Sequence, residues 1–232
     1  MRFNLVLVPG LLCDALLWRA QVDSLADAAD TWIADHTRSA TMADVARDVL
    51  ADAPFEDFAL AGLSMSGYVS LEIMRQAPKR VRKLALLDTA ARADTPEQTE
   101  ERKGFIELAA RGKFAGITET LMPQLIHPSR LRDLALTEAI KLMAKNVGKE
   151  AFVRQQQAIM SRAESRPLLA AIKCPTLVLC GRQDQLTPLD RHEEMAAGIQ
   201  GAKLDVIEEC GHVSTMERPD QVNRALRRWL AA

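Results

Sequence analysis

The sequence has few of the features that mark membrane-spanning, nucleic-acid-binding or metal-binding proteins. With 30 basic and 31 acidic residues its net charge is −1, so we expect no basic surface that would bind nucleic acid. The longest apolar stretches are short runs such as LALL and TLVLC, which cannot cross a bilayer. The cysteines lack the spacing of a metal site, and we expect reduced thiols at Cys13, Cys174, Cys180 and Cys210.

Signals for export and for cofactor binding are also missing. The first residues, MRFNLVLVPGLLCD, combine a basic residue with an apolar run, but Pro9 and Gly10 interrupt that run and no small-residue cleavage site follows. We therefore expect a strand here and a cytoplasmic protein. Neither G-x-G-x-x-G nor G-x-x-x-x-G-K-[ST] is present, so no nucleotide cofactor is expected, and no metal. We expect a small-molecule partner, and we expect the chain to be a monomer or a homodimer.

Strand-like and helix-like patterns alternate along most of the 232 residues. Near-continuous apolar runs such as KLALLD and TLVLCG are typical of parallel strands that are covered on both faces. Between such runs lie amphipathic helices, one of which Thr41 can cap. This order predicts an α/β protein with a doubly wound, mostly parallel sheet. Strands are expected at 3–8, 31–35, 57–64, 83–88, 176–181 and 204–209, and helices at 16–25, 67–77 and from Pro219 onward.

The stretch 89–169 breaks this alternation because it contains helical patterns but no convincing strand. We expect an all-helical lid inserted between two sheet strands, since segments of this length outside the sheet are usually functional. The core would then comprise 1–88 and 170–232. The alternative is that these helices only complete the core.

The stretch AGLSMSGYV contains a candidate nucleophile between a strand and a helix. Residues 62–66, Gly-Leu-Ser-Met-Ser, match the nucleophile elbow G-x-S-x-G with serine in the last place. The elbow requires small residues two before and two after the nucleophile. Tyr68 fails this requirement for Ser66, so Ser64 is the candidate, and Ser66 is expected to cap the helix. The alternative role for Ser64 itself is that of a helix N-cap.

A serine hydroxyl needs a base, and the chain has four histidines. His212 follows the last expected strand, where a loop brings it to the carboxyl edge of the sheet. His36 follows an early and weak strand, and His127 lies in the expected lid. His192 is flanked by charged residues in a helix and is expected on a solvated face. We therefore expect His212 to be the base.

The base needs a carboxylate to orient it and to stabilise its charged form. Asp184 follows a buried strand in the polar loop GRQDQLTP. Asp88 also ends a strand, and the residues alone leave it as a competitor. Asp184 is preferred because it gives the chain order Ser, Asp, His. We expect Asp88 to bind loop backbone at the root of the lid.

The negative charge that develops on an attacked carbonyl oxygen needs backbone N–H donors. One donor is normally the residue after the nucleophile, here Met65, at the N-terminus of a helix. The second is expected in the loop after the first strand, where Gly10 allows the backbone to turn. Leu11 is the expected donor, with Leu12 as the alternative.

These motifs together make the chain resemble an α/β-hydrolase over nearly its whole length. LVLVPGLL resembles the family's oxyanion segment, AGLSMSGYVSLE its elbow, CPTLVLCGRQDQLTP its acid loop and IEECGHVSTMERP its histidine loop. The resemblance is greatest to small bacterial carboxylesterases, enol-lactonases and carbon–carbon bond hydrolases. The chain departs from the family in having Pro9-Gly10 where His-Gly is common, which implies a different side-chain support for that loop.

The predicted function is that of a serine hydrolase acting on carboxylic esters through an acyl-enzyme, with Ser64, His212 and Asp184 as the triad. A lactonase or a carbon–carbon bond hydrolase would use the same residues. A ligand-binding protein that has lost catalysis is a further alternative, although it would have no use for the histidine and the acid together. The apolar residues of the expected lid favour an acyl or alkyl group that is not strongly charged, unless they form the lid's own core; they are Phe105, Leu108, Phe114, Met122, Leu125 and Met143.

Overall fold

A six-stranded parallel sheet forms the centre of the protein. The computed structural model describes residues 2–232, and the strand order across the sheet is β2-β1-β3-β4-β5-β6. All five strand pairs are parallel, so the carboxyl ends of the strands lie along one edge. The α/β, doubly wound fold is thereby confirmed. The strands are β1 (Phe3–Val8), β2 (Ala29–Ile33), β3 (Phe58–Leu63), β4 (Val81–Leu87), β5 (Thr176–Gly181) and β6 (Lys203–Ile207).

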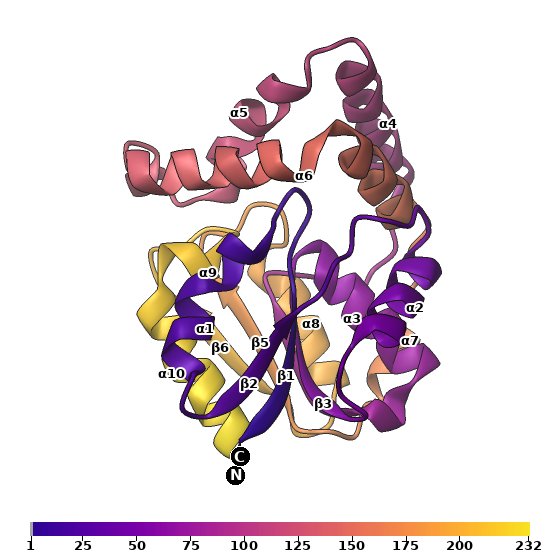
Figure 1. Cartoon of the computed structure of the whole chain (residues 1–232), viewed down its shortest axis with the longest axis vertical. Coiled ribbons are helices and arrows are strands. Elements are labelled where there is room, and N and C mark those ends of the chain that lie inside the picture. Colours follow the sequence, from indigo (N-terminus) through magenta and orange to yellow (C-terminus); the bar gives the residue numbers. More distant parts are fainter. Residues whose placement is uncertain (1) are drawn as a thin grey trace.

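Helices cover both faces of this sheet (Figure 1). The alternation of side chains along a strand explains the two layers. Leu5 and Leu7 of β1 belong to the core on the α1 and α10 side, whereas Val6 and Val8 belong to the core on the α2, α3 and α8 side. These helices are α1 (Arg19–Leu25), α2 (Met42–Asp52), α3 (Met65–Gln76), α8 (Leu189–Gly198) and α10 (Pro219–Ala231); short helices are η1 (Ala15–Trp18), η2 (Pro78–Arg80) and α9 (Ser214–Glu217).

Of two helix starts expected from the sequence, one is found as expected and one lies earlier in the chain. The Thr41 hydroxyl accepts a hydrogen bond from the N–H of Asp44 at 3.1 Å and so caps α2 as expected. The helix expected from residue 67 begins instead at Met65, directly after Ser64. The turn between β3 and α3 is therefore one residue long, which is the tightness that the elbow requires.

A layer of helices lies between β4 and β5 in the chain and beyond the carboxyl edge of the sheet in space (Figure 1). We call residues 89–169 the helical insertion. Its helices pack on one another around a small core that includes Ala109, Ile117 and Phe152. Gly148, with φ 79° and ψ 170°, bends the long helix into two halves. The helices of this layer are α4 (Pro96–Ala110), α5 (Phe114–Leu125), η3 (Pro128–Arg130) and α6 (Leu134–Met160). The last helix of the insertion, α7 (Arg166–Leu169), lies beside the sheet and packs on α8.

Within residues 2–232, no helix is both long enough and apolar enough to cross a membrane. All four cysteines in this range are free thiols, and Cys180 and Cys210 are buried.

Candidate active site

Ser64 occupies the one-residue turn between β3 and α3 with φ 59° and ψ −118°, a backbone conformation that side-chain-bearing residues rarely adopt. The turn is tight because Gly62 has no side chain: a Cβ atom there would lie 2.2 Å from the carbonyl oxygen of Ser66. Ser64 stands at the N-cap position of α3, but its side chain makes no capping hydrogen bond. The hydroxyl is therefore available for another partner.

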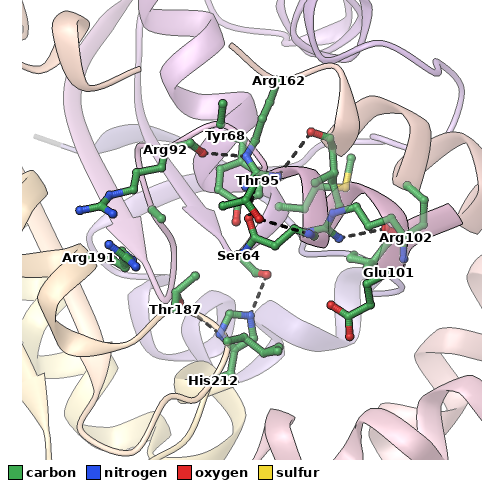
Figure 2. Close-up of a pocket in the computed structure, with 18 of the residues that line it drawn as sticks. Ser64, Tyr68, Arg92, Thr95, Glu101, Arg102, Arg162, Thr187, Arg191 and His212 are labelled. Carbon is green, nitrogen blue, oxygen red and sulfur yellow. Dashed lines mark hydrogen bonds between the residues drawn. The ribbon is translucent and has the colours of Figure 1, made fainter. Parts of the chain in front are cut away.

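That partner is His212, in the loop after β6 (Figure 2). Its Nε2 atom lies 2.7 Å from Ser64 Oγ, and its Nδ1 atom lies 2.8 Å from Asp184 Oδ2. With the proton on Nδ1, the imidazole donates to the Asp184 carboxylate and accepts the hydroxyl hydrogen of Ser64 at Nε2. The structure thus brings together the three side chains that the sequence pattern singled out.

Asp184 is held in its loop by several donors. Its Oδ1 atom accepts from the N–H groups of Leu186 at 2.9 Å and Thr187 at 3.0 Å, and its Oδ2 atom accepts from Thr187 Oγ1 at 2.7 Å. Burial opposes its ionisation, but His212 and these hydrogen bonds outweigh burial and hold the pKa of Asp184 below its usual value. Burial likewise disfavours the charged imidazole, but Asp184 outweighs it and raises the pKa of His212. Each group therefore favours the charged form of the other.

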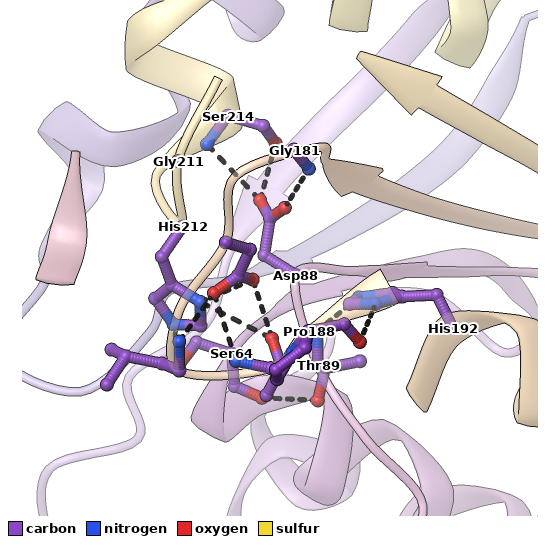
Figure 3. A network of polar contacts seen from close by, with 12 residues as sticks. Ser64, Asp88, Thr89, Gly181, Pro188, His192, Gly211, His212 and Ser214 are labelled. Carbon is purple, nitrogen blue, oxygen red and sulfur yellow. Dashed lines mark hydrogen bonds and ion pairs between the residues drawn. The ribbon is translucent and has the colours of Figure 1, made fainter. Parts of the chain in front are cut away.

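Asp88, the competitor for the acid, has no hydrogen bond to the imidazole among the described residues. Its carboxylate accepts from the N–H of Gly181 at 3.0 Å and from the N–H and the hydroxyl of Ser214 at 3.2 and 2.5 Å (Figure 3). Burial, followed by the charge of Asp184, raises the pKa of Asp88 to about 8. The expectation of backbone partners is correct, but they belong to the last residue of β5 and to the segment after β6 rather than to the helical insertion.

His192 does not lie on a solvated face, so that prediction was wrong. The residue is fully buried in α8, and its Nε2 atom accepts from the N–H of Thr89 at 2.9 Å. Thr89 in turn donates through Oγ1 to the carbonyl oxygen of Ser64 at 2.8 Å (Figure 3). Burial lowers the pKa of His192 to about 4, which keeps it neutral. The signal that could have identified it is its spacing from Met195 and Ile199, which places all three on one buried face.

Ser66 differs from expectation as well. It does not cap α3; its hydroxyl donates to the carbonyl oxygen of Pro9 in a short contact, and its side chain is buried. Ser66 therefore links the elbow helix to the loop after β1. Its small size satisfies the steric requirement of the elbow, as expected.

The loop after β1 is supported from the helical insertion. The N–H of Leu12 donates to Gln155 Oε1 of α6 at 3.1 Å, and Gln155 Nε2 lies 2.9 Å from His36 Nε2. Leu12 is therefore engaged, whereas no hydrogen bond within residues 2–232 uses the N–H of Leu11 or Met65. Gln155 was missed by the sequence analysis, and it provides the different loop support that Pro9 implied.

Two cavities meet at Ser64 and His212. The larger, of about 200 Å³, is lined by side chains from both the sheet edge and the insertion, including four arginines (Figure 2). The smaller, of about 80 Å³, has an almost wholly apolar wall. The apolar residues of the insertion predicted a site for a group that is not strongly charged, and of these two cavities only the smaller one has such a wall. The arginines are Arg92, Arg102, Arg162 and Arg191; the apolar wall includes Leu12, Leu63, Leu125, Ile140, Met143 and Val213.

The apolar residues of the expected lid divide between cavity walls and core. Phe105 lines the larger cavity, and Leu125 and Met143 line the smaller one. Phe114 packs on Phe152 with ring centroids 5.6 Å apart. Met122 is buried, and Leu108 is exposed.

No cluster of His, Cys, Asp or Glu in residues 2–232 has the arrangement of a metal site.

Comparison with known proteins gives a family match over residues 5–225, to the model described as the alpha/beta hydrolase family. Among curated proteins, a 2-hydroxy-6-oxo-6-phenylhexa-2,4-dienoate hydrolase of Comamonas testosteroni is 28% identical over 201 residues, covering 84% of this chain and 70% of that protein. A 2-hydroxy-6-oxononadienedioate/2-hydroxy-6-oxononatrienedioate hydrolase of Escherichia coli is 28% identical over 208 residues, covering 87% and 72%.

Solved structures give the same fold. A thermophilic esterase from Thermogutta terrifontis, with malate bound, superposes with a TM-score of 0.91 at 32% identity, covering 99% of this chain and 89% of that one. The enol-lactonase from Burkholderia xenovorans LB400 has a TM-score of 0.90 at 23% identity, covering 100% of this chain and 92% of that one. At this identity the likeness shows that the two proteins share a fold and no more.

Proposed function

The chain belongs to the alpha/beta hydrolase family, and from this we propose that it hydrolyses a carboxylic ester of a small molecule through an acyl-enzyme on Ser64. The observation that carries the proposal is the pair of hydrogen bonds made by His212, at 2.7 Å to Ser64 Oγ and 2.8 Å to Asp184 Oδ2. The first distance lies within the range required for proton transfer between a nucleophile and its base, and the second is that of a hydrogen bond that orients the base.

In the first step the Ser64 hydroxyl attacks the ester carbonyl while its proton passes to His212 Nε2. Asp184 stabilises the resulting imidazolium, which is consistent with the raised pKa of His212. The imidazolium then gives this proton to the departing alcohol. A water molecule, deprotonated by the same Nε2 atom, attacks the acyl-enzyme; as the acyl–Oγ bond breaks, the imidazolium returns this proton to Ser64 Oγ and the acid is released.

The oxyanion is stabilised in our proposal by the backbone N–H groups of Leu11 and Met65. Support comes from the hydrogen bond between Leu12 and Gln155, which removes the alternative donor, and from the location of Met65 at the first turn of α3. Donors that are fixed before the reaction stabilise the developing charge without reorganisation.

We also propose that residues 89–169 form a lid over a core made of 1–88 and 170–232. Side chains of α5 and α6 contribute to the walls of both cavities at Ser64, and side chains of α4 contribute to the larger one, which supports this division. A lid here would exclude water from the acyl-enzyme until the leaving group has departed.

A second function, carbon–carbon bond or lactone hydrolysis by the same triad, is supported about equally. The curated relatives named above are dienoate hydrolases at 28% identity, while the esterase is 32% identical. All three reactions begin at a carbonyl carbon and can use the same nucleophile and base.

A fluorophosphonate probe tests the nucleophile, and parallel assays on esters, lactones and dienoates separate the reactions. We expect a covalent adduct at Ser64, no adduct with Ser64→Ala, and turnover of esters. Ser64→Ala should lower kcat by a factor on the order of a million without unfolding the protein. Full activity in that variant would overturn the triad, whereas cleavage of dienoates or lactones alone would favour the second function.

A further inference from the structure

The larger cavity at Ser64 is markedly cationic although the whole chain has a net charge of −1. Four arginines line it, and Glu101, which is exposed, is the acidic side chain among the described residues of its wall. Two of the arginines have their own carboxylate: Arg92 binds Glu194 at 2.9 Å, and Arg191 lies 3.3 Å from Asp190. The remaining two, Arg102 and Arg162, do not.

Arg102 and Arg162 share one buried carboxylate. Asp94 Oδ2 lies 2.8 Å from Arg102 Nε, and Asp94 Oδ1 lies 2.5 Å from Arg162 Nη1. The side chains of Asp94 and Arg162 are only 2% and 5% exposed. These three residues, which we call the Arg–Asp–Arg cluster, therefore hold one excess positive charge. A desolvated charge without a counterion is costly, so the cluster favours the arrival of an anion.

The Arg162 guanidinium is held in place by its neighbours, but one of its nitrogen atoms has no hydrogen-bond partner among the described residues. Its central carbon lies 4.2 Å from the centroid of the Tyr68 ring, and its Nε atom donates to the carbonyl oxygen of Arg92 at 2.9 Å. No hydrogen bond within residues 2–232 uses its Nη2 atom. A guanidinium held over an aromatic ring with one nitrogen free can donate a charge-assisted hydrogen bond to a carboxylate.

The two cavities differ in polarity, and both reach Ser64 and His212. We propose that the substrate carries a carboxylate on one side of the scissile carbonyl, bound by Arg102 and Arg162, and a small apolar group on the other side, bound in the smaller cavity. This inference rests on the proposed hydrolase function and specifies its substrate class. One excess positive charge matches a singly charged carboxylate better than a phosphate monoester, which carries nearly two negative charges at neutral pH.

Matched esters test the inference in both orientations. Ethyl hydrogen succinate and ethyl butanoate differ only in whether the acid part ends in a carboxylate or a methyl group. Acetoxyacetate and ethyl acetate make the same comparison in the alcohol part. In at least one pair we expect kcat/KM to be higher for the charged ester by about tenfold or more. Equal or lower values for the charged member of both pairs would overturn the proposal.

Variants locate the binding site. Arg102→Gln and Arg162→Lys should both reduce the charged-to-neutral ratio of kcat/KM, mainly through a higher KM, and Arg102→Gln should reduce it by about tenfold. Arg111→Gln is the matched control, because Arg111 follows the same helix as Arg102 but is largely exposed and does not line the cavity. An unchanged ratio in folded Arg102→Gln protein would contradict the inference.

Binding to Ser64→Ala protein separates this inference from the proposed chemistry. Calorimetric titration with ethyl hydrogen succinate, which carries one negative charge, should give a complex that Arg102→Gln weakens, and inorganic phosphate should bind less well than this half-ester. If the half-ester binds in this way but no ester is cleaved by the unmodified protein, the ester function fails and the anion site stands. If esters are cleaved without any effect of the carboxylate, the anion site fails alone. Tighter binding of phosphate would overturn the assignment to a carboxylate.

Discussion

At the scale of single residues, the carboxylate of Asp184 controls the titration of the base. Because Asp184 raises the pKa of His212, the neutral imidazole that the reaction needs is lost at a higher pH than it would be without the acid. Asp184→Asn should therefore move the acidic limb of the kcat/KM profile to lower pH and lower kcat by roughly 10⁴-fold.

A pH profile of ester hydrolysis from pH 4 to 9 measures both effects, with Asp205→Asn as a control. Asp205 lies on β6 and pairs with Arg228 of α10, and it makes no contact with the residues at Ser64 described above. If the acidic limb stays in place in the Asp184→Asn variant, another group sets the pKa of His212. Asp88, the competing carboxylate, would be the first candidate.

Asp88 makes a second prediction at this scale, for stability rather than rate. Its pKa is about 8 in the folded protein, against about 4 for a free aspartate. The folded state binds this proton more tightly, so its contribution to stability is complete below about pH 4 and is lost as the pH rises through 8.

The amide in Asp88→Asn does not titrate. The melting temperature of the variant relative to the unmodified protein should therefore increase between pH 5 and 8, by several degrees at roughly 2–4 °C per kcal/mol. Thermal denaturation over this pH range measures it. A difference that is the same at every pH would show that Asp88 is already ionised in the fold.

The meeting of Ser64, Asp184 and His212 could be predicted because each residue follows a strand and parallel strands bring such positions to one edge. The burial of His192 could not be predicted from its neighbours, because these charged residues lie on the exposed side of α8 and the imidazole lies on the other side. The arginine-lined cavity was also beyond prediction, since Asp94, Arg102 and Arg162 meet only through the packing of the insertion.

At the scale of elements, α6 supports the loop after β1 through one side chain. Gln155 is fully buried and binds the N–H of Leu12, 143 residues away in sequence. Gln155→Ala should leave that N–H without its acceptor and loosen the loop that presents Leu11. We expect kcat to fall by about 10- to 100-fold while KM changes less, because the loss affects charge stabilisation in the transition state.

Gln157→Ala is the control, since Gln157 is exposed on the same helix. The measurement is kcat and KM with a neutral ester, accompanied by a melting curve. A change confined to KM or to stability would show that Gln155 has a structural role only.

The elements themselves were predictable to different degrees. The buried strands β3, β4 and β5 are marked by apolar runs, and their bounds lie within two residues of expectation. The insertion was predicted as helical, but not the bend of α6 at Gly148 or the contact of Gln155. Such contacts depend on where the insertion packs, which local periodicity does not determine.

At the scale of the whole molecule, the sheet and the insertion should differ in local stability. Every residue of β3 and β5 is buried, whereas Ala109 is the only buried residue of α4. Amides of α4 should therefore exchange with solvent much faster than those of β3. Hydrogen exchange followed by mass spectrometry measures this, and α8, a helix of the core, serves as the reference. Equal protection of α4 and β3 would contradict an insertion that opens separately.

The bend in α6 has a consequence for how the protein can diversify. The half before Gly148 supplies Ile140 and Met143 to the apolar cavity, and the half after it supplies Gln156 and Ile159 to the arginine-lined cavity. Substitutions in one half can thus alter the preference for one end of a substrate while the other end keeps its site. If a substrate occupies both cavities as proposed, a single helix bent at one glycine lets its two ends be recognised by residues that can evolve, or be engineered, separately.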